Sequence, residues 1–550
     1  MLGRGLNALL GDADNSNLTI KKNTDSFELS LDKIFVNPNQ PRTNFDSNEI
    51  DNLVVSIKEL GIIQPITVRK VNENKYEIIS GERRYRASKI ANLDSIPCYI
   101  KAVENDTDLL KMSLVENIQR VDLDPIEIAL TYERLINEYN LNIDIILNNS
   151  TFDFKKNFLN SIVTQSNHLK KNIKFEKNFL KKIEILTAII LSGLVFKEYE
   201  ANFQIGVKEL EAFVKNVFDN DGFPLSRNPN DLLFYSKYLI LCREVIKDSQ
   251  KYVPEFLEDI IEKNLICLNY IKTPNDQLPL FNGATISEIS QINQYLEKAK
   301  TKNITKENFG GLFKAKHKSH LIFFDIDKPP QKKFSNSYQS GPLSFEYFID
   351  DVKIISNSGF GSSISKKAET LSRLTACQST LTMNDTSVTK FEQNELIKKV
   401  FGNSIKDDFK SFELTAKDEN GLLGCSATNN GYEKRFGCTH KREIYIDKEN
   451  NYLKGIDHIF KKKDGYPVRY SFRFHVSPEL TVVKTMSGNG ALIQVAKNKS
   501  LLFTINDENL ELEKSIYFAE KKILDSTCIT ITGNLVNKNK SFNWEIKKNI

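Results

Sequence analysis

The spacing of apolar residues changes from a helical period to a period of two near residue 308. Upstream, one helix face of apolar residues precedes the turn-forming segment 220–224; it consists of Val207, Leu210, Phe213, Val214, Val217 and Phe218. Downstream, residues 468–476 alternate apolar and polar types, and further strand-like runs lie at residues 321–326, 491–496, 501–505 and 529–532. Such alternation is typical of antiparallel sheets with one buried face. We therefore predict a helical region over residues 153–305 and an antiparallel β-sandwich over residues 306–550.

The segment 81–88, Gly-Glu-Arg-Arg-Tyr-Arg-Ala-Ser, follows a strand-like run at residues 76–80. Gly81 accepts the backbone angles of a tight strand-to-helix turn. The first free N–H groups of the helix then point outward, and arginine side chains there can fork onto phosphate oxygens. The pattern predicts a phosphate-binding turn; the alternative is an exposed basic start of a helix.

Three further segments give this turn a context. They are residues 2–11 (Leu-Gly-Arg-Gly-Leu-Asn-Ala-Leu-Leu-Gly), residues 37–42 (Asn-Pro-Asn-Gln-Pro-Arg) and residues 116–120 (Glu-Asn-Ile-Gln-Arg). Together with the turn, and in this order, they closely resemble the N-terminal part of the ParB family of chromosome-partitioning proteins. The resemblance implies an α/β domain over residues 25–140, preceded by a flexible tail at residues 1–24.

The ParB resemblance also implies a pocket for cytidine triphosphate (CTP) with magnesium. Gln40 and Arg42 would line the nucleotide, and the triphosphate would be held by Gly81, Glu82, Arg83, Arg84, Tyr85 and Arg86. Glu116 and Asn117 would bind Mg²⁺, which prefers carboxylate and amide oxygens. For Glu116, the alternative is a solvated carboxylate paired with Arg120 at i+4.

The tail would, by the same resemblance, stimulate a ParA-type ATPase partner through Leu2, Gly3, Arg4, Gly5 and Leu6. Its alternative is an ordinary disordered terminus. DNA is a partner that the resemblance implies, although residues 141–172 contain no glycine, no arginine and no recognisable helix-turn-helix. The polar cluster at residues 148–151 indicates a junction over residues 141–152.

Five segments of the remaining chain carry a second resemblance, at residues 221–229, 280–283, 341–346, 375–380 and 473–478. Together they resemble the heparinase II/III-like family of polysaccharide lyases. The resemblance implies an α/α toroid, incomplete here because the early helices are missing, followed by a β-sandwich. It also implies an acidic polysaccharide as partner.

The residues expected to carry lyase chemistry are replaced. Such lyases are expected to use a tyrosine and a histidine as acid and base, with a structural metal held by histidines and an aspartate. Gln339, Asn357 and Gln378 stand at the expected metal positions, and residues 230–232 replace the tyrosine. We therefore expect no zinc and doubt lyase activity.

His440 and His475 remain as weak catalytic candidates, because a lone histidine is more often a hydrogen-bonded structural residue. His475 alternates onto a polar strand face with Arg469 and Arg473, which either binds an acidic sugar or is simply solvated. Glu346 matches a family segment, with a structural hydrogen bond as its alternative role.

Composition limits the compartment and the partners. The 550 residues carry a modest net charge of +5, and seven widely spaced cysteines indicate reduced thiols. The longest uncharged apolar stretch, residues 185–196, is too short to span a bilayer. It is expected to continue a buried helix face from Phe175, Phe179, Leu180 and Ile183. A cytoplasmic protein without a membrane partner is expected.

Three hypotheses about function follow. The first is a ParB-like CTP-binding module, with CTP hydrolysis left open, fused to a degenerate heparinase II/III-like region. The second is a polysaccharide lyase or glycan-binding protein with an incidental ParB-like segment. The third is a non-functional fusion of two neighbouring genes, each truncated at the junction.

Overall fold

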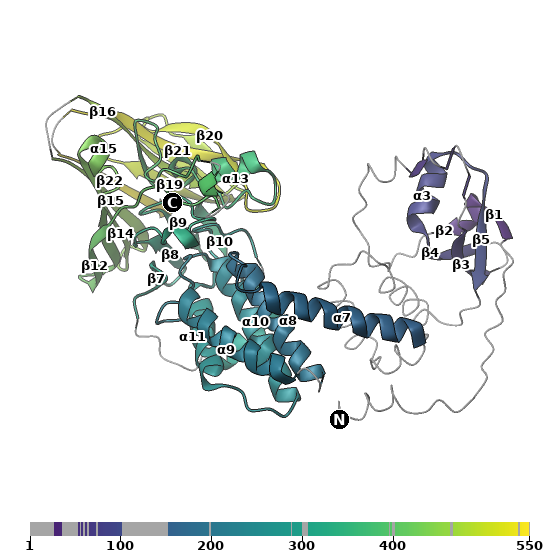
Figure 1. The fold of residues 1–550 in the computed structure, drawn as a ribbon. Coiled ribbons are helices and arrows are strands. Elements are labelled where there is room, and N and C mark those ends of the chain that lie inside the picture. The colour runs from purple at the N-terminus through teal and green to yellow at the C-terminus, as the bar shows by residue number, and fades with distance from the viewer. Residues whose placement is uncertain are drawn as a thin grey trace. The chain divides into compact units, whose positions relative to one another are not determined.

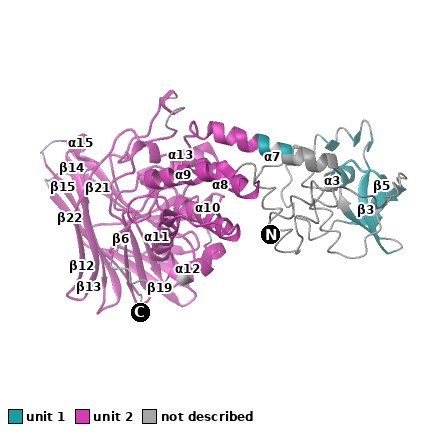
Figure 2. Ribbon diagram, turned by 60° about the horizontal axis from the view of Figure 1, so that its bottom comes forward, with its two compact units in different colours: residues 1–164 teal, residues 165–550 magenta. Residues whose placement is uncertain are grey.

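The chain forms two compact units, Met1–Thr164 and Gln165–Ile550, which Figure 2 distinguishes by colour. They are seen in a computed structural model that describes residues 27–35, 53–54, 57–58, 61–62, 65–72, 75–101, 152–196, 200–287, 289–299, 306–394, 396–398, 402–462, 466–536 and 539–548. Each unit is a separate body with its own apolar core.

The first unit contains a five-stranded mixed sheet in the order β1-β5-β3-β4-β2. Its elements are β1 (Phe27–Ser30), η1 (Leu31–Lys33), β2 (Ile34–Phe35), β3 (Ile66–Asn72), β4 (Lys75–Ser80), α3 (Glu82–Ile90) and β5 (Ser95–Lys101). The core beneath α3 consists of Leu31, Ile34, Ile66, Val68, Ile78, Tyr85, Ile96 and Cys98. The predicted α/β class is confirmed, as are the strand before Gly81 and the helix after it.

The second unit begins with a helical region, as the apolar spacing predicted. Its helices are α7 (Phe152–Asn172), α8 (Phe179–Val195), α9 (Glu200–Val217), α10 (Pro229–Asp248), α11 (Glu255–Ile271), η3 (Ser290–Ile292) and α12 (Asn293–Ala299). The first part of α7 lies before the unit boundary. Helix α8 packs against α9 and α10, and α10 packs against α11.

Small residues allow the close approach of α8 and α9. A Cβ at Gly193 of α8 would lie 2.1 Å from the backbone nitrogen of Phe203 of α9, so a larger residue would force the helices apart. One detail of the predicted helix face is wrong: Phe175 lies between α7 and α8 with 78% of its surface exposed. Neighbouring Phe179 packs on the helical core, so the helix face begins there.

Two antiparallel sheets form the predicted sandwich. The nine-stranded sheet follows the order β20-β21-β16-β10-β9-β8-β7-β6, with β11 paired to β16. Its strands are β6 (Asn308–Phe309), β7 (Leu312–His317), β8 (His320–Asp325), β9 (Phe345–Ile349), β10 (Val352–Ser356), β11 (Leu381–Met383), β16 (Val468–Val476), β20 (Glu511–Tyr517) and β21 (Leu524–Leu535).

The eight-stranded sheet follows the order β12-β13-β14-β15-β22-β19-β18-β17. Its strands are β12 (Ser411–Glu419), β13 (Leu422–Asn429), β14 (Cys438–Asp447), β15 (Tyr452–Lys461), β17 (Thr481–Lys484), β18 (Gly490–Ala496), β19 (Lys499–Ile505) and β22 (Asn539–Lys548). Short helices occur between strands: η4 (Lys332–Phe334), α13 (Lys366–Ser372), η5 (Thr375–Cys377) and α15 (Glu433–Phe436). Every strand-like run of the sequence falls within a strand of one of these sheets or extends one residue past it.

Aromatic rings fill the space between the two sheets. The ring centroids of Phe345, Phe474 and Phe503 lie 5.5, 5.0 and 6.1 Å from that of Trp544. Gly455 of the neighbouring strand β15 is required here, because a Cβ would lie 2.0 Å from the Trp544 ring. A second cluster joins the helices to strands β6–β9, so helices α8–α11 lie beside the sandwich within this unit (Figure 1).

All seven cysteines are free thiols, and six of them are buried. Burial raises the pKa of Cys242 and of Cys377 to about 11, which keeps both in the unreactive thiol form near neutral pH. Within the described residues, no helix combines the length and apolar character that a membrane crossing requires.

Candidate functional site

The turn between β4 and α3 is the segment that the sequence predicts to bind phosphate, and we call it the cradle. Gly81 caps α3 in the left-handed region, with φ 102°, and its carbonyl accepts the first helical hydrogen bond from Tyr85 N at 3.1 Å. A Cβ at this position would lie 2.7 Å from Cγ2 of Ile66. Backbone angles and space both require glycine, so the free N–H groups at the start of α3 are presented at a fixed place.

The side chains of the turn divide into supporting and exposed groups. Arg84 donates from Nη1 to the carbonyl of Pro65 at 2.8 Å, which ties the helix to the start of β3. Tyr85 is 4% exposed and donates its hydroxyl to the carbonyl of Ile34 at 2.7 Å. Arg86 is exposed. Tyr85 therefore positions the helix from within the core, whereas Arg86 lies on its exposed side.

Several predicted site residues lie outside the described part of the chain. They are Gln40, Arg42, Glu116, Asn117 and the tail residues Leu2, Gly3, Arg4, Gly5 and Leu6. For Glu82 and Arg83, the backbone belongs to α3 and the side chains lie outside the described part. The cradle is thus seen through Gly81, Arg84, Tyr85 and Arg86.

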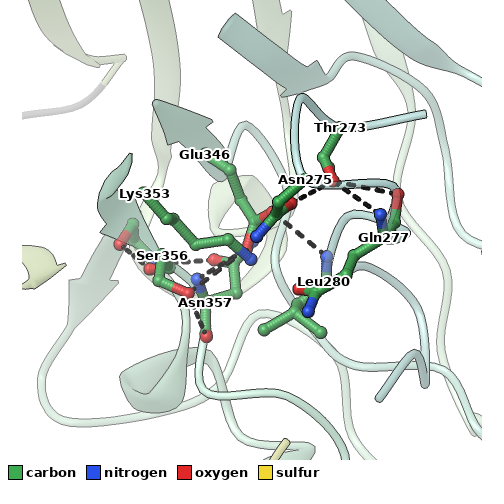
Figure 3. Close-up of polar contacts among 9 residues, drawn as sticks. Thr273, Asn275, Gln277, Leu280, Glu346, Lys353, Ser356 and Asn357 are labelled. Carbon is green, nitrogen blue, oxygen red and sulfur yellow. Dashed lines mark hydrogen bonds and ion pairs between the residues drawn. The ribbon is translucent and has the colours of Figure 1, made fainter. Parts of the chain in front are cut away.

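In the second unit, Glu346 is a completely buried carboxylate (Figure 3). Its Oε1 accepts from Lys353 Nζ at 3.1 Å, Ser356 Oγ at 3.2 Å and Asn357 N at 3.3 Å. Its Oε2 accepts from Leu280 N at 3.2 Å. Each oxygen is satisfied from within the protein, so Glu346 joins the 280–283 segment to strands β9 and β10 structurally.

The three amides at the expected metal positions are hydrogen-bonded within the protein. Gln339 and Gln378 both donate to the carbonyl of Ser372, at 2.8 and 3.0 Å. Gln339 also accepts from Gly283 N at 3.0 Å, and Asn357 Oδ1 accepts from Ser379 N at 3.0 Å. These amide hydrogen bonds connect the segments around Gln339, Asn357 and Gln378 to their neighbours in the fold.

His440 belongs to a buried ionic network. Asp457 accepts from His440 Nε2 at 2.7 Å, from Arg442 Nε at 2.7 Å and Nη2 at 3.1 Å, and from Trp544 Nε1 at 2.8 Å. Burial acts to raise the pKa of Asp457, but Arg442 and His440 outweigh it and hold that pKa well below its usual range. Burial lowers the pKa of His440. The imidazole is enclosed and engaged, which excludes access of a polymer to it.

His475 is also enclosed and does not lie on a solvated face. Its Nδ1 lies 2.7 Å from Ser515 Oγ and its Nε2 lies 3.0 Å from the carbonyl of Ala376. Arg473, which was expected to share that face, bonds to Ser471 Oγ at 2.6 Å. Both candidate histidines therefore have structural partners, and the structure does not bring them to one site.

The position of the expected catalytic tyrosine is the start of α10. Asn228 caps this helix through Asn230 N at 2.9 Å, and Asp231 accepts from Ser226 Oγ at 2.6 Å. Burial raises the pKa of Asp231 to about 6, against the opposing effect of Ser226. The neighbouring Arg227 forms a buried ion pair with Asp325 of β8, so this segment fastens the helices to the sandwich.

Sequence reasoning missed Asp457, Trp544 and the Arg227–Asp325 pair. An aspartate inside the otherwise apolar alternation of β15, and the single tryptophan of the chain in β22, are the signals that could have pointed to the first two. Nothing local indicates the Arg227–Asp325 pair, because 98 residues separate its members.

Family models match two parts of the chain. Residues 15–118 match the ParB N-terminal domain, and residues 300–545 match the heparinase II/III-like, C-terminal family. A probable chromosome-partitioning protein ParB of Pseudomonas putida is 40% identical over 144 residues, which are 26% of this chain and 49% of that protein. The chain thus spans about half the length of the curated relatives it matches.

Solved structures resemble the same two parts. Crystalline heparinase III aligns with a TM-score of 0.62 at 12% identity, covering 100% of this chain and 89% of that one, which shows a shared fold. The C-terminally truncated ParB of Caulobacter crescentus, solved with CTP-gamma-S, is 34% identical, covers 22% of this chain and 71% of that one, and has a TM-score of 0.17.

Proposed function

We propose that this chain, which joins a ParB N-terminal domain at residues 15–118 to a heparinase II/III-like domain at residues 300–545, is a CTP-binding module on a non-catalytic lyase-type scaffold. One observation carries the proposal: Gly81 holds a left-handed turn that fixes the start of α3, where free backbone N–H groups can bind an anion. A nucleoside triphosphate is the anion proposed here, with support from the ParB of Caulobacter crescentus, which was solved with CTP-gamma-S.

The chemistry of the residues supports each part of that pocket. Free N–H groups at a helix start and arginine forks suit phosphate oxygens. Glu116 and Asn117 offer the hard oxygen ligands that magnesium prefers beside phosphates. The bound metal would neutralise part of the triphosphate charge, while Gln40 and Arg42 would contact the nucleotide. Whether the chain turns CTP over depends on residues beyond this cradle.

Calorimetry on the full-length chain tests the proposal. With magnesium present, we expect CTP to bind more tightly than ATP. Arg84→Ala removes both a phosphate contact and the tether to Pro65, and a lost charge-assisted bond of about 1.5–3 kcal/mol predicts a loss of affinity of about tenfold or more. Lys89→Ala is the matched control, because it removes the same charge from the last turn of α3.

Two results would contradict the nucleotide proposal. One is equal affinity for CTP and ATP. The other is an equal loss of affinity in the Arg84 and Lys89 variants, which would indicate general attraction by positive charge and not a cradle.

We further propose that the sandwich region performs no β-elimination on acidic polysaccharides. His440 and His475 are enclosed by their partners, and the tyrosine position holds Asp231 at a helix start. The assay is ultraviolet absorbance of unsaturated product from heparin-like and alginate-like polymers. A rise that disappears in His440→Gln or His475→Gln would overturn this proposal and restore the lyase hypothesis.

The partners and compartment proposed for the chain are those of a partitioning protein: a ParA-type ATPase that contacts Leu2 to Leu6, DNA, and the cytoplasm. The support is the 40% identity to a ParB protein over 144 residues. Stimulation of a ParA-type ATPase that is lost in Arg4→Ala tests the tail. An unchanged stimulation in that variant would contradict the role proposed for it.

A further inference from the structure

A cavity of about 380 Å³ lies between helix α11, the turn that follows it and strand β7. Its polar lining includes Lys272, Thr273, Asp276, Lys314 and Lys316, and Leu321 contributes to an apolar wall. The volume falls within the range of small-molecule sites, which combine apolar walls with a few placed polar groups. All of these residues belong to the second unit.

The turn that forms one wall is fixed by its own hydrogen bonds (Figure 3). Thr273 Oγ1 lies 2.7 Å from Asn275 Oδ1, accepts from Gln277 N at 3.0 Å and lies 3.0 Å from the Gln277 carbonyl. The backbone closes the same loop, because Thr273 N donates to the Gln277 carbonyl at 3.0 Å. The wall is therefore formed before any ligand binds.

The lining carries more positive than negative charge. Lys272 pairs with Asp276 at 2.8 Å, so these two charges offset each other. Lys314 and Lys316 are two residues apart in β7 and therefore share a strand face. Among the described residues, neither of these two lysines has a carboxylate within ion-pair distance.

The Lys314 ammonium is held in place by neutral groups. It donates to the carbonyl of Tyr270 at 2.5 Å and lies 5.5 Å from the ring centroids of both Tyr270 and Phe323. Burial lowers the pKa of Lys314 to about 8, and the charge of Lys316 adds to this effect. An anion in the cavity would offset the repulsion between the two lysines.

We propose that this cavity binds a small organic oxyanion, a carboxylate or a phosphate, between Lys314 and Lys316. The ammonium groups supply two positive charges, and the apolar wall at Leu321 accommodates the carbon skeleton of the ligand. The site is independent of the nucleotide cradle and of the segments that match the lyase family's catalytic positions.

Amine footprinting on the full-length chain locates such binding. The chain is acetylated with acetic anhydride in the absence and presence of succinate or inorganic phosphate, and the modified lysines are mapped by peptide mass spectrometry. With the reaction run at about pH 7, below the pKa of Lys314, a bound anion that raises this pKa by one unit lowers the free-amine fraction, and so the reaction rate, about tenfold. Exposed Lys484 of β17 is the internal reference, whose rate should not change.

The two anions distinguish a carboxylate ligand from a phosphate ligand, and protection by either supports the proposal. Lys316→Gln should abolish the protection of Lys314, whereas the matched variant Lys484→Gln should retain it. An unchanged rate at Lys314 with both anions would overturn the proposal. An equal fall at Lys314 and Lys484 would do the same, because it would show general screening.

Discussion

Buried charge in the sandwich is arranged so that each ionic group has a fixed partner. Arg442 is completely buried, and besides Asp457 it donates to the carbonyls of Leu343 and Ser379 at 2.9 and 2.7 Å. Removing one member of such a set leaves an uncompensated buried charge, which is strongly destabilising. His440, which resembles a catalytic candidate in the sequence, is one of the hydrogen-bond partners of the Asp457 carboxylate.

The enclosure of His475 predicts a pH dependence of stability. Burial first, and Arg473 second, lower its pKa to about 4, whereas an unfolded histidine titrates near 6.5. Between these values the unfolded chain binds a proton that the folded chain does not, so the free energy of unfolding falls as pH drops. The contribution is complete above about pH 6.5 and amounts to about 3 kcal/mol.

His475→Gln should therefore flatten the fall in the urea midpoint of the second unit between pH 7 and pH 4.5. His168→Gln is the control, because His168 is exposed on α7 and is bonded there to its neighbour Asn172. Part of the dependence of the urea midpoint on pH should remain in His475→Gln, because the pKa of buried His320 is also lowered to about 4. The same slope in all three proteins would contradict the enclosure of His475.

At the scale of elements, the β4–α3 connection is encoded by adjacent residues. Gly81→Ala places a side chain at φ 102° and a Cβ 2.7 Å from Ile66, which should cost about 1–3 kcal/mol. The helix start must then move, so we also expect weaker CTP binding. Calorimetry and thermal unfolding of the full-length variant measure the two effects.

Gly61→Ala separates backbone strain from steric contact. Gly61 also has positive φ, at 68°, but no heavy atom of the residues that the structure describes lies within 4 Å of a Cβ built there. It should lose some stability while CTP affinity stays near that of the unchanged chain. If both variants lose affinity equally, the contact with Ile66 does not set the position of the cradle.

Features set by neighbouring residues could be predicted from the sequence, whereas contacts between distant residues could not. The turn at Gly81 and the apolar face of β16 follow from neighbouring residues, so both were predictable. The surroundings of the polar face of β16 could not be predicted, because the Ala376 carbonyl that bonds to His475 is 99 residues away in the sequence. The lysine cavity likewise needs the fold to bring Lys272 beside Lys314.

At the scale of the whole molecule, a long segment separates the two family matches. The ParB match ends at residue 118, and the heparinase II/III-like match begins at residue 300. Between them, the boundary of the compact units falls inside α7, after Thr164. The part of α7 after this point belongs to the second unit: Ser166 is buried, Leu169 packs on the helical core, and Lys170 donates to Asn202 at 3.1 Å. The sequence alone placed the junction earlier, over residues 141–152, from its polar composition.

We predict that a protease of broad specificity cleaves the chain within residues 141–152 and spares residues 165–172, because Ser166 is buried and Leu169 packs on the helical core. The two fragments should unfold in separate transitions, since each unit has its own apolar core. Peptide mapping after limited proteolysis, followed by calorimetry of intact and cleaved chain, measures both. A single cooperative transition without cleavage before residue 165 would mean that the halves stabilise each other, and the hypothesis of two joined genes should then be abandoned.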